Sequence, residues 1–434
     1  MPRLFAACGT GPAPSLRDPA RRRLVLAAAL AGGCAGTASL AFAASPRPTE
    51  RRFVLVILRG GMDGLSAVPA IGDPDFPPAR GPLANLGAPA LPLDATFALH
   101  PALASLHAMY GAGELAVVHA VGLPYRERSH FDAQQLLESG GAKPYEITTG
   151  WLGRALSDVR GRGIALSTAV PLVLRSRAEV DTWAPSVLPE PSADLVARLE
   201  RLYADDPVLA TALQRAKALH LEGGIAGAGT TQTGSSPGGS AQGAMQPAAM
   251  QPGTGGGANG GPRGGFVMLA QRAAEFLVQP SGPEVAVLEL GGWDTHANQA
   301  SANGPLAFAL RQLDAGLAGL RAGLAPGDAW KRTVIVVATE FGRQVAVNGT
   351  LGTDHGTGGA AFVLGGAVRG GRVLAEWPGL AGKDRYEGRD LRTTTDLRAL
   401  LKGVLADHLQ IPGARIESDV FPGSEVVRPL ALLA

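Results

Sequence analysis

The chain has 434 residues, of which 46% are hydrophobic and 5% aromatic, so it is long enough to bury a sizeable core in one large domain or two ordinary ones. Its 39 basic and 37 acidic side chains leave a formal net charge of only +2, which excludes the strongly basic face of a typical nucleic-acid-binding protein. The 60 glycines and 33 prolines indicate a loop-rich protein or one that carries a low-complexity insert.

Residues 1–43 are typical of an export signal and not of a folded element. Arg21, Arg22 and Arg23 precede a mildly hydrophobic Ala/Leu/Gly segment, which ends at the small-residue sequence Ala41-Phe42-Ala43. The paired arginines and the long polar lead-in favour the twin-arginine export machinery as a partner, and therefore a periplasmic or secreted protein. A general secretory signal and an uncleaved N-terminal anchor are the alternatives.

Both cysteines, Cys8 and Cys34, lie in this leader. We therefore expect a mature chain with no disulfide, no thiolate metal site and no cysteine nucleophile. Any metal ion would be bound by histidines and carboxylates. No later run of residues is long and apolar enough to span a membrane, so we expect no transmembrane segment in the mature chain.

Residues 53–58 form a continuous apolar run, which predicts a strand that is buried on both faces. Three further largely apolar runs, residues 115–121, 284–290 and 333–338, also predict strands. Amphipathic helices are predicted between and after these runs. The sequence therefore predicts an α/β fold: a doubly wound, mainly parallel sheet with helices on both faces. The predicted helices lie within residues 98–111, 128–141, 305–324 and 393–409.

Two of these helices have recognisable starts. Ser129 is the expected N-cap of the second helix, with Asp132 three residues further on in the manner of a capping box. Thr394 or Thr395 is the expected N-cap of the last helix.

Residues 222–264 interrupt the pattern, because they are rich in Gly, Ala, Ser, Pro and Gln and almost uncharged. Such a segment cannot bury enough apolar surface to offset its chain entropy. We interpret it as a disordered surface insert within a single domain of residues 44–434. A linker between two domains is the alternative, but the strands that follow continue the earlier alternation.

Polar residues follow each predicted strand, at the edge of the sheet where ligands bind in folds of this class. Asp63 follows the first strand, and His130 follows the second. Asp294 and His296 lie directly after the third, two residues apart, so that both side chains can reach one ion from extended backbone. Glu340 ends the fourth strand, and a glycine-rich loop, "GTDHGTGG", then carries an adjacent Asp and His.

Each of these motifs also has a structural interpretation. Asp63 and Asp294 can cap turns, and Glu340 can pair with Arg343. If the motifs converge, however, they would hold one or two divalent ions (Zn, Mn or Ca) with an open position for water or substrate. The candidate ligands are Asp63, Asp294, His296, Glu340, Asp354 and His355, with His130 as an additional candidate.

Ser129 is the candidate nucleophile, because the start of a helix attracts an anionic group through its free N–H groups and its dipole. The alternative for Ser129 is a simple N-cap. Arg126, Arg128 and Arg343 are candidates for binding the oxygens of a small anionic ester.

The motifs "LRGGMDGLSAV", "SHFDAQ", "GGWDTHAN", "TEFGR", "TDHGTGG" and "DLRALLKGVL", in this order, resemble an exported bacterial family, domain of unknown function 1501. That family is grouped with the alkaline phosphatase and sulfatase superfamily. The resemblance covers nearly all of the mature chain, and it implies an alkaline phosphatase-like α/β fold with metal ligands at the strand ends.

The resemblance also implies roles for single residues: Asp63 as a metal ligand after the first strand, Ser129 as the nucleophile, and His355 as the final histidine ligand. Three features depart from the superfamily pattern. Only one residue separates Asp294 from His296, and Glu340-Phe341 replaces the usual Asp-His pair. The candidate nucleophile also has an unusual neighbour, His130. The sequence therefore predicts a periplasmic, metal-dependent hydrolase of phosphate or sulfate esters, with a non-catalytic cell-envelope assembly or binding protein on a degenerate hydrolase fold as the alternative.

Overall fold

The computed structural model describes residues 50–157, 162–185, 191–224 and 265–433, without the side chains of residues 218–224. These residues belong to one compact unit, Pro48–Ala434. The predicted export signal, both cysteines and residues 225–264 of the predicted insert lie outside the described residues.

A mixed sheet forms the centre of the fold, and its strand order is β10-β4-β9-β8-β1-β7-β5-β6, with β11 beside β4. Strand β1 is central and pairs in parallel with both β7 and β8. A separate two-stranded sheet pairs β2 with β3. The strands are β1 (Arg52–Leu58), β2 (Leu91–Pro92), β3 (Ala98–Leu99), β4 (Leu115–Gly122), β5 (Gly163–Ala165), β6 (Val180–Thr182), β7 (Val285–Leu290), β8 (Thr333–Thr339), β9 (Gly359–Leu364), β10 (Arg372–Leu374) and β11 (Thr395–Asp396).

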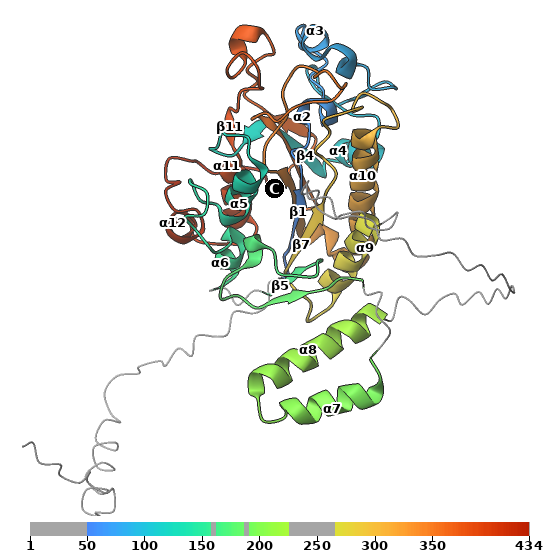
Figure 1. Cartoon of the computed structure of the whole chain (residues 1–434), viewed down its shortest axis with the longest axis vertical. Coiled ribbons are helices and arrows are strands. Elements are labelled where there is room, and N and C mark those ends of the chain that lie inside the picture. Colours follow the sequence, from blue (N-terminus) through green and yellow to red (C-terminus); the bar gives the residue numbers. More distant parts are fainter. Residues whose placement is uncertain (1–49, 158–161, 186–190, 225–264, 434) are drawn as a thin grey trace, which may run out of the picture. The chain divides into compact units, whose positions relative to one another are not determined.

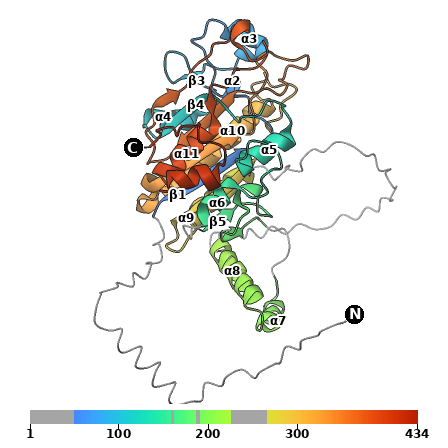
Figure 2. The ribbon, with the colours of Figure 1, turned by 90° about the vertical axis from the view of Figure 1, so that its left-hand side faces the viewer.

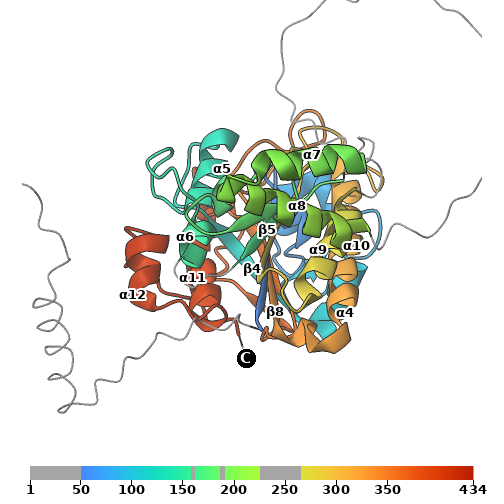
Figure 3. The same ribbon diagram turned by 90° about the horizontal axis from the view of Figure 1, so that it is seen from below.

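Helices cover both faces of the sheet, as predicted (Figures 1 and 3). The helices are α2 (Gly64–Ala67), α3 (Phe76–Arg80), α4 (Ala104–Gly111), α5 (His130–Ser139), α6 (Trp151–Ser157), α7 (Ala193–Tyr203), α8 (Pro207–Gly224), α9 (Gly265–Val278), α10 (Pro305–Leu324), α11 (Leu397–Asp407) and α12 (Gly413–Arg415).

The two faces of β1 contribute to two different cores, because successive side chains of a strand point to opposite sides. Val54, Val56 and Leu58 are buried against α4, α9 and α10. Phe53, Leu55 and Ile57 are buried against α5, α6 and α11, the layer that faces the viewer in Figure 2. This double burial explains why the strand is a continuous apolar run, and it confirms the four predicted strands and the α/β class.

The sequence predicted β1, β4, β7 and β8 but not the other strands, of which β9 matters most for the site. Strand β9 follows directly after the glycine-rich loop and runs antiparallel to both of its neighbours, β4 and β8. The sheet is therefore mainly parallel with one antiparallel insertion. This insertion places the loop that carries Asp354 and His355 beside the carboxyl end of β8.

The structure corrects the predicted start of α11 and confirms the N-cap position of α5, although not its capping box. The N-cap of α11 is Asp396, whose carboxylate accepts a hydrogen bond from the amide of Arg398, because Thr395 is part of strand β11. Ser129 does occupy the N-cap position of α5, but its hydroxyl makes no capping hydrogen bond. The capping box is absent because the Asp132 carboxylate accepts from the hydroxyl of Tyr125, at 3.0 Å.

Within the described residues, no helix is both long and hydrophobic enough to cross a bilayer.

Candidate metal centre

Three imidazoles and one carboxylate meet where α5 begins and where β7 and β8 end. The Nε2 atom of His355 lies 3.0 Å from Nε2 of His130 and 3.0 Å from Nε2 of His296. Oδ1 of Asp294 lies 2.9 Å from Nε2 of His296, 3.2 Å from that of His355 and 3.5 Å from that of His130. We call these four residues the His–Asp cluster.

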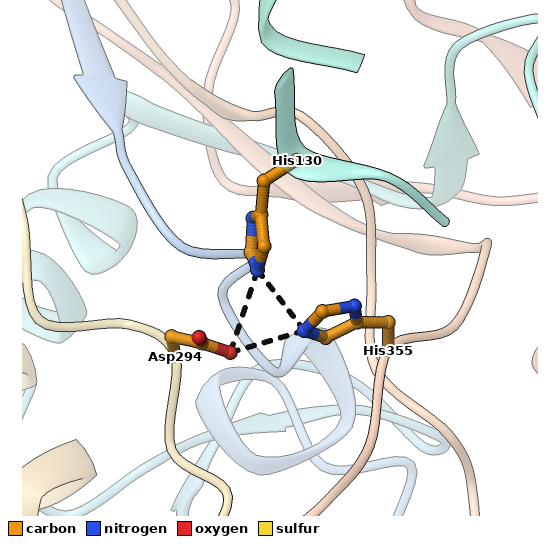
Figure 4. A group of neighbouring side chains, drawn as sticks. All are labelled: His130, Asp294 and His355. Carbon is orange, nitrogen blue, oxygen red and sulfur yellow. Dashed lines mark hydrogen bonds and ion pairs between the residues drawn. The ribbon is translucent and has the colours of Figure 1, made fainter. Parts of the chain in front are cut away.

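Three members of the cluster are arranged as metal ligands. One ligand atom each from His130, Asp294 and His355 lies within 4.8 Å of the other two, and Figure 4 shows the three side chains pointing toward one another. These residues could hold a metal ion. Three protein ligands with one open position are typical of catalytic metal sites, whereas structural sites are closed by four.

The far side of every imidazole in the cluster faces an oxygen acceptor. Nδ1 of His130 lies 2.8 Å from Oε1 of Glu340, and Nδ1 of His296 lies 3.1 Å from Oδ1 of Asp354. Nδ1 of His355 lies 3.0 Å from the carbonyl oxygen of Arg128. Since an oxygen acceptor requires an N–H donor, these contacts place the proton of each neutral imidazole on Nδ1.

With all three imidazoles neutral, three Nε2 lone pairs and a carboxylate oxygen would face one another with no donor among them. Acceptors at about 3 Å repel unless a proton or a cation lies between them. Histidine ligands of metals show the same arrangement, with the outer N–H donated to a carboxylate or carbonyl. The donor chemistry of this cluster therefore fits a bound cation.

Glu340 lies behind His130 in the core and does not face the cluster directly. Its carboxylate also accepts hydrogen bonds from the amide of Gly60, at 2.9 Å, and from the side chain of Gln134, at 3.1 Å. Burial raises the pKa of Glu340, but these hydrogen bonds and the one from His130 outweigh it, so the pKa lies below its ordinary value. Glu340 is thus an ionised carboxylate that orients His130.

Arg343 is a buried anchor for the loops around the cluster. Its Nε donates to Gly61 O at 2.7 Å, Nη1 to Thr353 O at 3.0 Å, and Nη2 to Gly60 O at 2.6 Å. Nη2 also donates to the carbonyl of Trp293 and to Oδ1 of Asp294. The predicted alternative pair of Arg343 with Glu340 is not formed, because Glu340 pairs with His130 and Arg343 with Asp294.

The pKa of Asp294 lies well below its ordinary value. Burial opposes this shift, but hydrogen bonds from His130 and His355 and the charge of Arg343 outweigh burial. Asp294 is therefore a carboxylate over the whole physiological range of pH, as a metal ligand must be.

The glycines of "GTDHGTGG" allow other chain segments to approach the loop. A Cβ at Gly352 would lie 2.2 Å from the carbonyl carbon of His296, and one at Gly356 would lie 2.4 Å from that of Arg343. Only glycine can occupy either position without moving the neighbouring backbone. Asp354 and His355, between them, are thereby held against the segments that carry His296 and Arg343.

Asp63 takes part in a different buried network. Its carboxylate caps α2 by accepting from the amides of Leu65 and Ser66, and it is paired with Arg80 and hydrogen-bonded to Gln299. Burial raises the pKa of Asp63, but the charge and hydrogen bond of Arg80 outweigh it and lower the pKa. The structure therefore places this predicted ligand outside the His–Asp cluster.

Ser129 lies between two residues of the site. The carbonyl of Arg128 orients His355, and the next residue after Ser129 is His130 itself. The backbone of Arg128 is left-handed, with φ of 61°, which costs free energy for a residue other than glycine. Its side chain is anchored by Asp390 at 2.8 Å and by Glu387 at 2.6 Å.

The sequence identified all members of the cluster but did not predict which of them are central to it. His130 was only an additional candidate, although it contacts Glu340, His355 and Asp294 at once. Its position directly after the N-cap of a helix that follows a buried strand was the available signal. The supporting role of the Arg128 carbonyl has no signal in the sequence, since any residue carries a carbonyl.

The comparisons with solved structures return proteins of low identity. They include the sulfatase PsFucS1 from Pseudoalteromonas sp., which is 13% identical, with a TM-score of 0.39 over 96% of this chain and 76% of that one. A phosphonate monoester hydrolase of Agrobacterium radiobacter is 11% identical, with a TM-score of 0.38 over 83% and 74%. A protein in the alkaline phosphatase superfamily from Vibrio parahaemolyticus is 10% identical, with a TM-score of 0.34 over 74% and 62%.

No curated protein matches the chain. The model of one protein family, described as "Protein of unknown function (DUF1501)", matches residues 85–418, a stretch that contains every member of the His–Asp cluster. The chain belongs to the DUF1501 family.

Proposed function

We propose that the chain is a metal-dependent hydrolase of phosphate or sulfate esters, and that His130, Asp294 and His355 hold the ion. The observation that carries the proposal is the convergence of three Nε2 lone pairs and one carboxylate oxygen, each imidazole being held from behind by an oxygen acceptor. Nitrogen-rich donors of this kind favour Zn²⁺ or Mn²⁺ over Ca²⁺, which prefers six to eight oxygen ligands. One ion per chain is expected at the cluster.

A bound divalent ion would polarise the ester and lower the pKa of water at the open position. The residues of this chain would supply the other functions. The Ser129 hydroxyl, which makes no capping bond, is the candidate nucleophile at the start of α5. His296 is the candidate proton donor to the departing alcohol. Asp354 accepts from its Nδ1, so that Nε2 faces the cluster and would donate when the imidazole carries a proton on both nitrogens.

Positive charge beside the cluster supports an anionic substrate. Arg389 donates to the carbonyl of His355 at 2.9 Å, and the guanidinium groups of Arg126 and Arg128 both lie 5.8 Å from the ring centre of Tyr386. Arg126 donates to two backbone carbonyls and has no carboxylate partner among the described residues. Its charge is therefore available to attract a phosphate or sulfate group.

The first test is metal content. Purified protein, His355→Ala and His296→Ala are dialysed against Zn²⁺ or Mn²⁺, and bound metal is measured together with hydrolysis of a panel of phosphate and sulfate esters. We expect about one ion in the wild type, none in His355→Ala, and one in His296→Ala with little turnover. His107→Ala, which changes a histidine outside the cluster, is the matched control.

Absence of bound metal in the wild type after loading would contradict the proposal. Loss of the ion from His296→Ala would make His296 a fourth ligand and overturn its role as proton donor. Bound metal without turnover of any ester would favour the non-catalytic alternative, a binding protein on a hydrolase fold.

We also propose export by the twin-arginine route to the periplasm or the medium. The support is the arginine cluster and the small-residue sequence of the leader. Fractionation of cells that express the wild type or the double variant Arg22→Lys, Arg23→Lys tests this: the variant should remain in the cytoplasm with its leader attached. Equal export of both proteins would exclude this route.

A further inference from the structure

A cavity of about 520 Å³ lies at the same edge of the sheet as the His–Asp cluster. It is bordered by the first turns of α9 and α10 and by the residues that follow β5 and β7. Its walls are largely apolar and include Leu166, Phe266, Leu269, Leu290 and Phe308. A volume of this size is in the range that holds a small organic molecule.

The cavity offers no unpaired charged side chain among its lining residues. Its uncharged polar residues are Ser167, Thr168 and Gln312, and its one carboxylate, Glu289, already pairs with Arg59 at 2.6 Å. Arg59 is itself shared with Glu138, at 2.8 Å. A charged ligand would lose its hydration without finding a free counter-ion, whereas an apolar ligand gains from burial.

The cavity and the candidate metal centre are neighbours along the chain that follows β7. Residues 289–292 line the cavity, and the same strip continues through Trp293 into Asp294. Two residues of extended chain span about 7 Å. A Cβ added at Gly292 would meet no atom of the described residues within 4 Å, so the cavity is open at this position. Gly292 and Asp294 are thus close enough for one substrate molecule to reach both.

We propose that this cavity receives the apolar organic group of the substrate, so that the substrates are phosphate or sulfate esters of apolar alcohols. The inference rests on the proposed function, because it places the ester group at the His–Asp cluster. It goes further by naming the chemistry of the alcohol and the surface that selects it.

Gly265, the first residue of α9, gives a direct way to fill the cavity. It lines the cavity, and a Cβ added there meets no atom of the described residues within 4 Å, so Gly265→Trp directs a large side chain into the cavity opening. Gly413→Trp is the matched control: Gly413 is also the first residue of a helix, α12, also has open space at its Cβ, and is not among the cavity residues.

The test measures binding and turnover separately on the full chain loaded with Zn²⁺. Binding of 2-naphthol is followed by its fluorescence, and KM is determined for 2-naphthyl phosphate and sulfate beside methyl phosphate and sulfate. Wild type and Gly413→Trp should bind 2-naphthol equally. Gly265→Trp should bind it about tenfold more weakly and show a KM about tenfold higher for the naphthyl esters only, because a ring-sized apolar group can no longer be buried.

Equal affinity of wild type and Gly265→Trp for 2-naphthol would overturn the inference, as would an equal loss of activity on naphthyl and methyl esters. Weaker 2-naphthol binding in Gly265→Trp together with no turnover of any ester would overturn the proposed function alone, since the cavity would still be the site for an apolar group. Thermal unfolding of the three proteins shows whether the substitutions preserve the fold.

Discussion

The Nδ1 atom of His130 lies 2.8 Å from Oε1 of Glu340, a carboxylate that is buried and ionised behind the candidate metal centre. This contact fixes the ring of His130 so that its Nε2 faces Asp294 and His355. Glu340 thus acts on the cluster only through His130. Substitution of Glu340 can therefore measure its effect on metal binding without removing a ligand.

Glu340→Gln should weaken metal binding about 10- to 100-fold without removing a ligand, because a neutral amide no longer supports the basicity of His130. The affinity is measured by competition with a chelator. Glu114→Gln, which changes a carboxylate paired with Arg321 at another place, is the control and should bind metal normally. An unchanged affinity in Glu340→Gln would show that His130 is not a ligand.

Ser129→Ala should abolish ester hydrolysis while leaving bound metal and stability unchanged. The reason is that the Ser129 hydroxyl makes no capping bond in α5, so its removal costs the helix little. If Ser129 were a working N-cap, the substitution would lower the free energy of unfolding by about 1 kcal/mol. Urea unfolding and initial rates distinguish the two roles, and full activity in Ser129→Ala would exclude it as the nucleophile.

Metal binding should depend on pH through His130. In the metal-free protein, burial lowers the pKa of His130, but hydrogen bonds to Asp294 and Glu340 outweigh burial and raise the pKa to about 9. A metal ion must displace this proton, so the apparent affinity should rise by up to about tenfold per pH unit between pH 7 and 9 and then level off. Calorimetry in buffers of different ionisation enthalpy should detect the released proton.

The raised pKa of His130 also predicts how the stability of the metal-free protein depends on pH. A raised pKa in the folded state means that the contribution of His130 is complete below the unfolded pKa of about 6.5 and is lost as pH rises through 9. The free energy of unfolding should therefore fall between pH 7 and 10. In His130→Gln this part of the fall should be missing, and an identical profile in both proteins would contradict the assigned contacts.

Arg343→Met should be one of the most destabilising single substitutions, with a loss of about 3–5 kcal/mol, because it leaves four backbone carbonyls and Asp294 without their donor. Chemical denaturation measures the loss. Arg311→Met removes an exposed guanidinium with one backbone contact and should change stability by less than about 0.5 kcal/mol. Similar small losses in both variants would contradict the anchoring role of Arg343.

The sequence predicted best those elements whose burial is visible in their own residue pattern. Strands β1 and β8 are buried on both faces, so residues 53–58 and 334–338 are all apolar and the pattern identifies them. Strand β9 was missed because it is a short run behind a glycine-rich loop, and its antiparallel pairing with β4 and β8 depends on segments far away in the chain.

The sequence predicted the site as a set of residues at strand ends, but it did not predict which of these residues contact one another. Asp63 has the same sequence signal as Asp294, namely an Asp after a strand and two glycines. Asp63 lies outside the cluster because it pairs with Arg80, seventeen residues later. No local sequence pattern predicts this pair. The helix start at Asp396 was assigned wrongly to Thr394 or Thr395, because the pairing of Thr395 with Val121 of β4 is a tertiary contact.

The place of β1 in the sheet has a consequence for the order in which the protein forms. Its two hydrogen-bonded neighbours begin at Val285 and Thr333, so this central strand leaves the ribosome more than 230 residues before either partner exists. A nascent chain that ends before Val285 holds an apolar strand with both edges unpaired, and such segments aggregate unless they are shielded. Strand β1 can therefore complete its pairing only after β8 has been made, and we expect chaperones that bind extended apolar segments to associate with it until then.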